Sequence, residues 1–97
     1  MLDKIKQLME IKQQANVIKR ELEGLRIEAN EVRGIRIVID GAQHFQSLEI
    51  ENGLLDAPNK NRLEADLLRS INAAVHKSQV LAAQKMKNMT GLDIPGL

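Results

Sequence analysis

The chain has 97 residues, a net charge of +1 at pH 7 and a single aromatic residue, Phe45. This length fits one domain with a thin core, and that core has to be aliphatic. Cysteine is absent, which excludes disulfides and thiolate metal sites. No apolar run approaches the ~18 residues of a membrane span, and no signal-peptide core is visible. We therefore expect a cytoplasmic protein that does not enter a membrane.

Residues 2–23 contain neither glycine nor proline, and their apolar side chains recur at steps of three and four. This spacing predicts a long amphipathic helix that ends near Gly24. Its apolar seam is expected to consist of Leu8, Ile11, Ala15, Ile18, Leu22 and Leu25.

Three short strands are predicted next, over residues 25–29, 35–40 and 45–51, with turns between them. Alternation places one set of apolar residues on a single face: Leu25, Ile27, Ala29, Ile35, Ile37, Ile39, Leu48 and Ile50. The other face is expected to be polar, with Arg26, Glu28, Arg36, Asp40, Glu49 and Glu51. Val38 and Phe45 are the exceptions, and we expect them to pair across the strands. An antiparallel sheet of this kind needs a cover over its apolar face.

A second, longer helix is predicted over residues 59 to about 89, which again lack glycine and proline. Asp56 is expected to cap it, with Pro58 in its first turn. The closing segment GLDIPGL, residues 91–97, is expected to be a flexible tail after a single domain over residues 1–90.

The two helices are too long for the sheet. A six-residue strand spans about 20 Å, whereas helices of 22 and 30 residues span about 33 and 45 Å. The surplus apolar seams can pack on each other or on a second subunit, and the thin core favours a homodimer. We expect the dimer interface to include Ile35, Ile37, Ile39, Leu48 and Ile50.

Positive charge lies at both ends of the chain. Residues 1–20 hold five Lys/Arg and two Asp/Glu (+3), residues 21–68 hold five and ten (−5), and residues 69–97 hold four and one (+3). On a helical wheel, four side chains of the second helix fall within about 40° opposite its apolar stripe: Arg62, Arg69, His76 and Lys87. Such a face is either a solvated surface or a contact for an acidic partner.

Nothing in the chain indicates catalysis. His44 and His76 have no histidine partner three or four residues away, so a metal site is not expected. The serines lack a nucleophile-elbow context, and the isolated glycines form no phosphate-binding loop. We expect no enzyme activity, no cofactor and no small-molecule substrate.

The ordered pattern as a whole resembles the YbaB/EbfC family of bacterial nucleoid-associated proteins. The matching segments are MLDKIKQLMEIKQQA, IRIVIDG, LEIENGLLD, LEADLLRSINAAVHK with Asn72, and QKMKNMTGLDIPGL. This resemblance implies an α+β fold of order α-β-β-β-α, in two layers. It also implies dimerisation through the three-stranded antiparallel sheets, with the long helices projecting as arms that bind DNA. The chain departs from the family at NEVRG (residues 30–34), where a run of glycines is reduced to Gly34.

The resemblance and the charge distribution together predict a homodimer that binds duplex DNA in the nucleoid, with an effect on nucleoid organisation or gene expression. Contacts with phosphates are expected from two groups of side chains, Lys4, Lys12, Lys19 and Arg20 on the first helix and Arg69, His76, Lys77 and Lys87 on the second. The shortage of aromatic residues argues against modules that stack single-stranded bases. The alternative is a scaffold dimer that binds another protein through its helical seams and binds no nucleic acid.

Overall fold

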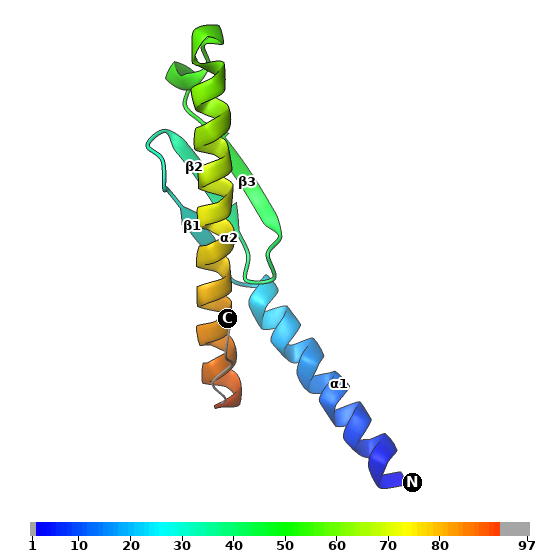
Figure 1. Cartoon of the computed structure of the whole chain (residues 1–97). Helices are drawn as coiled ribbons and strands as arrows, with labels where there is room; N and C mark the ends of the chain where they lie inside the picture. Colours follow the sequence, from blue (N-terminus) through cyan, green and yellow to red (C-terminus); the bar gives the residue numbers. More distant parts are fainter. Residues whose placement is uncertain (1, 92–97) are drawn as a thin grey trace.

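The structure is a computed structural model that describes residues 2–91 (Figure 1). Its elements follow in the order α1 (Leu2–Glu23), β1 (Ile27–Ala29), β2 (Ile35–Ile39), β3 (Phe45–Ile50) and α2 (Lys60–Thr90), with short 3-10 helices at Asn52–Leu54 and Ala57–Asn59. The predicted α-β-β-β-α order and the α+β class are therefore confirmed.

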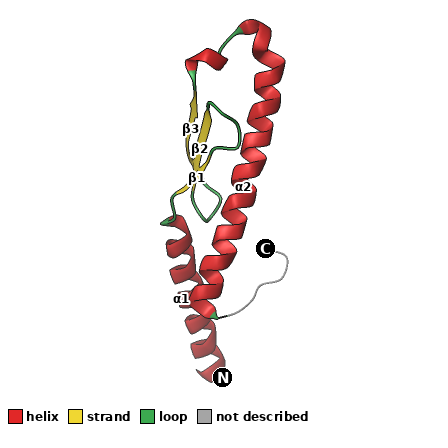
Figure 2. Ribbon diagram, turned by 90° about the vertical axis from the view of Figure 1, so that its left-hand side faces the viewer, coloured by secondary structure: helices red, strands yellow, loops and turns green. Residues whose placement is uncertain are grey.

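The three strands form one antiparallel sheet in the order β1-β2-β3, with β2 in the centre. The helix α2 lies across β1 and β2, so that sheet and helix make two layers (Figure 2). Because strand side chains alternate between the two faces, one set of aliphatic residues meets the helix. The buried core consists of Ile27, Ala29, Ile35, Ile37 and Ile39 from the sheet and Ala74 from α2.

The helix ends follow from local chemistry. The helix α1 stops where the amide of Gly24 donates to the carbonyl of Arg20. The helix α2 stops at Gly91, whose φ of 71° lies in the left-handed region that glycine adopts readily, and whose amide donates to the carbonyl of Lys87. The predicted cap at Asp56 is wrong for α2. Asp56 precedes the 3-10 helix Ala57–Asn59, its side chain makes no capping hydrogen bond, and α2 begins only at Lys60.

The face of the sheet that was predicted to be polar, apart from Val38 and Phe45, differs from the prediction at three residues. Val38 is fully buried and Asp40 is only 2% exposed. The register shifts after Val38, which pairs with Ser47, while Ile39 pairs with Phe45, so that one extra residue of β3 enters between them. Phe45 consequently does not pair with Val38. It lines a shallow cavity of about 280 Å³ on the α2 side of the sheet instead.

The described chain is strongly elongated, with extents of 66 × 21 × 18 Å. Its radius of gyration of 18.3 Å exceeds the about 12.5 Å expected of a globular chain of this length. The reason is visible in Figure 1, where α1 leaves the sheet and diverges from α2. None of the 22 residues of α1 is buried within the described chain. The two helical seams therefore do not pack on each other along their length.

Candidate nucleic-acid interface

One groove runs along α2 on the side of the β1 edge. Arg69, Asn72, His76 and Lys77 line it from the helix, because residues three, four and seven apart share one helical face. Asn30 and its neighbours at the end of β1 form the facing wall. The cavity has a volume of about 930 Å³ and is open to solvent. Three of the eight side chains predicted to contact DNA are thus brought together here.

The charge of this groove is modestly positive. Arg69 and Lys77 against Glu31 leave a formal charge of +1. Lys77 already makes one hydrogen bond within the chain, because its Nζ atom donates to the carbonyl oxygen of Glu28 at 2.5 Å. That bond ties α2 to β1 and holds the ammonium group at the rim of the groove.

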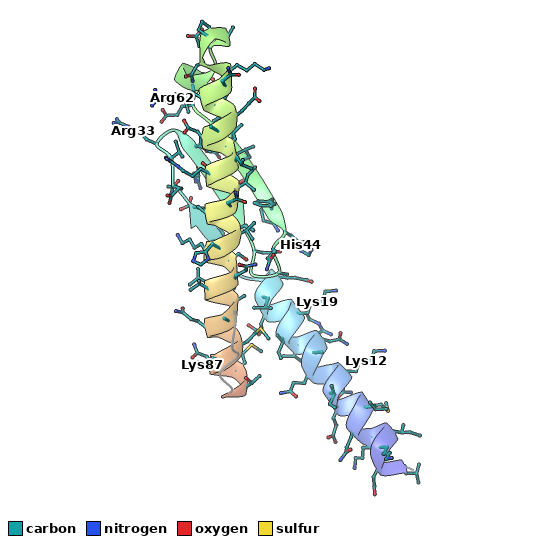
Figure 3. The ribbon with its side chains drawn as sticks, in the orientation of Figure 1. Lys12, Lys19, Arg33, His44, Arg62 and Lys87 are labelled. Atoms are coloured by element: carbon teal, nitrogen blue, oxygen red, sulfur yellow. The ribbon has the colours of Figure 1, made fainter. Side chains whose placement is uncertain are left out.

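A second cavity, lined by two arginines and two aspartates, lies nearer the N-terminal end of α2. Arg33, from the loop between β1 and β2, lines a cavity of about 560 Å³ together with Arg62 of α2. Figure 3 shows both side chains on the same side of the molecule. Asp56 and Asp66 line the same cavity, and Arg62 forms an ion pair with Asp66 at 3.9 Å.

Sequence reasoning did not include Arg33 among the site residues. Its position in a predicted turn gave no periodicity, and only the fold brings it beside a helix residue 29 positions later. The available signal was weak, namely a single cation in the loop that precedes the central strand.

The cations of α1 form a separate group. Lys4, Lys12, Lys19 and Arg20 are all exposed, and Lys19 makes an ion pair with Glu23 at 3.9 Å. In the view of Figure 3, Lys12 and Lys19 project from the side of α1 that faces away from α2, while Lys87 projects from the opposite side of α2. The eight predicted DNA contacts therefore occupy two arms and do not converge on one point within a single chain.

The residues predicted for the dimer interface have two different surroundings. Ile35, Ile37 and Ile39 are covered by α2 of their own chain. Leu48, by contrast, is 52% exposed, and Ile50 is half-buried. Leu48 lies beside Phe45 and Ile71, and Leu68 is exposed one turn before Ile71. We call Phe45, Leu48, Leu68 and Ile71 the β3 patch.

Residues 2–91 show neither a metal-binding cluster nor a helix suited to span a membrane. In that range no three His, Asp or Glu residues gather in a way that could hold a metal ion. His44 has an acidic neighbour, with its Nδ1 atom 3.3 Å from Oδ2 of Asp40, but no further metal-binding side chain joins them. None of the described helices is long and apolar enough to cross a membrane.

Comparison with known proteins agrees with this arrangement. Residues 1–92 match the model of the YbaB/EbfC DNA-binding family. A nucleoid-associated protein of Pelotomaculum thermopropionicum is 30% identical over 95 residues, which cover 96% of this chain and 90% of the relative. A nucleoid-associated protein of Thermoanaerobacter sp. is also 30% identical, over 96% of this chain and 86% of the relative. One from Prochlorococcus marinus is 31% identical, over 95% and 82%.

The fold and its exposed cations define a small α+β protein with basic helices, of the class that binds nucleic acid. The chain belongs to the YbaB/EbfC DNA-binding family, which is not a family of enzymes.

Proposed function

We propose that this protein is a nucleoid-associated protein that binds duplex DNA as a homodimer, mainly through the phosphate backbone. The observation that carries the proposal is the groove on α2, where Arg69, His76 and Lys77 share one open surface in a chain of a DNA-binding family. The relatives are named nucleoid-associated proteins, which supports the same location for this chain.

Backbone contact is favoured over base reading by the chemistry of these surfaces. The exposed cations are mostly lysines and arginines on two helices, and such residues bind phosphates by displacing counterions irrespective of sequence. Stacking on unpaired bases needs aromatic side chains, and Phe45 is the single aromatic residue of the chain. Phe45 belongs to the β3 patch and does not line the groove of Arg69, His76 and Lys77 on α2.

The β3 patch and the seam of α1 support the homodimer. The strand β3 is an edge strand whose apolar residues Phe45 and Leu48 are about half exposed. On α1, Leu2, Ile5 and Leu8 are each more than half exposed. Apolar surface of this extent, next to a thin core, is typical of a subunit interface. A second copy of the chain can cover both surfaces symmetrically.

The test is fluorescence anisotropy of a labelled duplex of random sequence, titrated with the protein at several salt concentrations. If a dimer engages about five phosphates, the plot of log affinity against log salt has a slope of about −4.5, so raising salt from about 50 to 200 mM weakens binding roughly 500-fold. An unlabelled duplex of unrelated sequence should compete equally well.

The scaffold alternative predicts a different result. A contact between an apolar helical seam and another protein depends little on salt, because few charges are involved. Absence of any salt-dependent binding to duplex DNA would exclude the proposed function and favour a protein partner for the exposed seam of α1.

A further inference from the structure

The turn between β2 and β3 is held by an unusual concentration of hydrogen bonds. Asp40 is buried, and its Oδ1 atom accepts hydrogen bonds from the amides of Ala42 at 2.8 Å and His44 at 2.9 Å. Its own amide donates to the carbonyl of His44 at 3.0 Å. A side chain that bonds backbone amides two and four residues ahead fixes the shape of a turn. These hydrogen bonds define the shape of the turn, residues 40–44.

The same turn also contacts both long helices. The amide of Gly41 donates to the carbonyl oxygen of Leu22 at 2.8 Å, in the last turn of α1. The hydroxyl of Ser78, fully buried on α2, donates to the carbonyl oxygen of Asp40 at 2.7 Å. Carbonyls in the last turn of a helix have no partner inside the helix, and the carbonyl of Leu22 accepts from the amide of Gly41 and, at 3.2 Å, from the amide of Leu25. Two adjacent residues thus connect the end of one arm to the middle of the other.

Gly41 leaves no room for a side chain at this contact. A Cβ atom there would lie 2.9 Å from the carbonyl oxygen of Leu22 and 2.8 Å from Cδ1 of Leu25. The leucine methyl group can rotate away, but the helix carbonyl is backbone and moves only if the end of α1 moves. Gly53 provides the contrast, because a Cβ atom there would have no neighbour within 4 Å.

We infer that the turn 40–44 is the joint that sets the angle between α1 and α2, with Asp40, Gly41 and Ser78 as its positioning residues. Beyond the joint, no residue of α1 is buried within the described chain. A partly exposed ion pair joins Glu21 of α1 to Lys85 of α2 at 3.4 Å. About 20 residues of helix extend some 30 Å from Leu22, so a tilt of about 10° at the joint moves the tip by roughly 5 Å.

For DNA binding this inference rests on the proposed function. The cations of α1 reach the phosphates only if the arm has the right direction. At about 0.1 M salt, each phosphate contact that is lost weakens binding roughly eightfold.

The test measures the arm angle directly. The natural chain has no cysteine, so spin labels can be attached at Gln7→Cys and Asn88→Cys, both exposed positions on the two helices. Labelled protein is diluted into excess unlabelled protein, so that distances within one chain dominate the dipolar spectrum. Gly41→Ala should shift the mean distance by up to about 4 Å, as expected when a tilt of about 10° acts over the roughly 22 Å between Leu22 and position 7. The matched control Gly53→Ala should leave it unchanged.

Ser78→Ala provides a second variant in case Gly41→Ala does not fold, as judged by circular dichroism. Loss of the hydroxyl frees the turn from α2 and should broaden the distance distribution. If the distance distribution is unchanged in every folded variant of Gly41 and Ser78, the inference that the turn 40–44 sets the angle between α1 and α2 is wrong.

Duplex binding is measured on the same variants without spin labels. Gly41→Ala should weaken it about eightfold or more at about 0.1 M salt, and Gly53→Ala should not. A shifted distance between the spin labels with an unchanged affinity for duplex DNA would mean that the turn sets the helix angle but that this angle does not affect binding. If the wild type binds no duplex at any salt, the proposed function fails, while the distance measurement still decides whether the joint exists.

Discussion

Ile37 and Leu48 are direct partners across β2 and β3, yet their surroundings are opposite. Ile37 is 2% exposed beneath α2, and Leu48 is 52% exposed because α2 lies over the other two strands. The boundary between the core of one chain and its exposed apolar surface therefore passes between two paired residues. Substitutions at the two positions should separate folding from association.

The replacement Ile37→Ala should lower the free energy of unfolding by about 2–5 kcal/mol, since it removes buried methyl groups and leaves a cavity. Urea unfolding followed by circular dichroism measures this loss. A change below about 1 kcal/mol would mean that the core does not depend on this side chain.

Leu48→Ala should leave the fold of the single chain largely intact and weaken the dimer instead. Two half-exposed leucines, one from each subunit, lose about 2 kcal/mol of apolar burial, which corresponds to a roughly 30-fold higher dissociation constant. Sedimentation equilibrium of the variant and the wild type measures the dissociation constant of the dimer. An unchanged dissociation constant would mean that the β3 patch is not part of the dimer interface.

Residue-level prediction succeeded where strict alternation holds. It placed Ile27, Ile35 and Ile37 together on one apolar face that needs a cover, and they are buried in the core beneath α2. It failed at Phe45, because a bulge shifts the register by one residue and nothing in the local pattern marks it. Asp40 was misjudged for a related reason. Its charge suggests exposure, but the amides of its own turn supply the hydrogen bonds that make burial acceptable.

At the scale of elements, α1 is a helix with exposed charges, of which Glu21 pairs with Lys85 of α2. Its periodic pattern and the glycine after it were sufficient to predict its ends. The start of α2 was harder to predict, because Asp56 and Pro58 have the chemistry of a helix start. Pro58 lies in the 3-10 helix before α2, and Asp56 precedes that 3-10 helix. Grooves that join a loop to a helix, such as the one between Arg33 and Arg62, depend on tertiary packing and were not predictable.

Reversal of charge on α1 tests whether this arm binds DNA. Lys12→Glu with Lys19→Glu should weaken binding to all duplexes alike and flatten the salt slope, since both side chains are exposed and displace counterions. Stability should change little, because exposed pairs such as Lys19 with Glu23 contribute about 0–1 kcal/mol. Anisotropy across a salt series measures both quantities.

The matched control reverses two exposed acidic residues of the sheet region, Glu49→Lys and Glu51→Lys. It should not weaken binding, and removal of repulsion should strengthen it slightly. If the lysine reversal leaves both affinity and slope unchanged, α1 is not a DNA-binding arm.

Arg33→Ala tests the pair of arginines, Arg33 and Arg62, that only the fold brought together. Loss of one phosphate contact per chain should weaken duplex binding by about eightfold per contact at about 0.1 M salt. Arg26→Ala removes the same charge from an exposed residue near the opposite end of the sheet and serves as its control. Equal effects of the two substitutions would mean that overall charge matters and the groove beside Arg62 does not.

At the scale of the whole molecule, the thin core makes stability depend on association. Few residues are buried within one chain, whereas long apolar stretches of α1 are exposed. We expect the melting temperature to rise with protein concentration, because dimer formation stabilises the folded state by mass action. Calorimetry over a hundredfold range of concentration measures this dependence. A melting temperature independent of concentration would indicate that the single chain is stable by itself.

Metal removal should have no effect on the fold. The chain has no cysteine, and residues 2–91 contain no cluster of side chains suited to a metal ion. Addition of EDTA should leave the melting temperature unchanged, in contrast to proteins whose folding depends on a structural metal. A large decrease would contradict this expectation and require a ligand set that includes residues outside the described range.

The elongated shape has a practical consequence for chromatography. A chain with a radius of gyration of 18.3 Å occupies as much room as a globular protein of about 260 residues. On a gel-filtration column calibrated with globular standards, even a single 10.9 kDa chain would elute at an apparent mass well above its own. Early elution is therefore expected of monomer and dimer alike, and the subunit number has to come from light scattering, sedimentation equilibrium or native mass spectrometry.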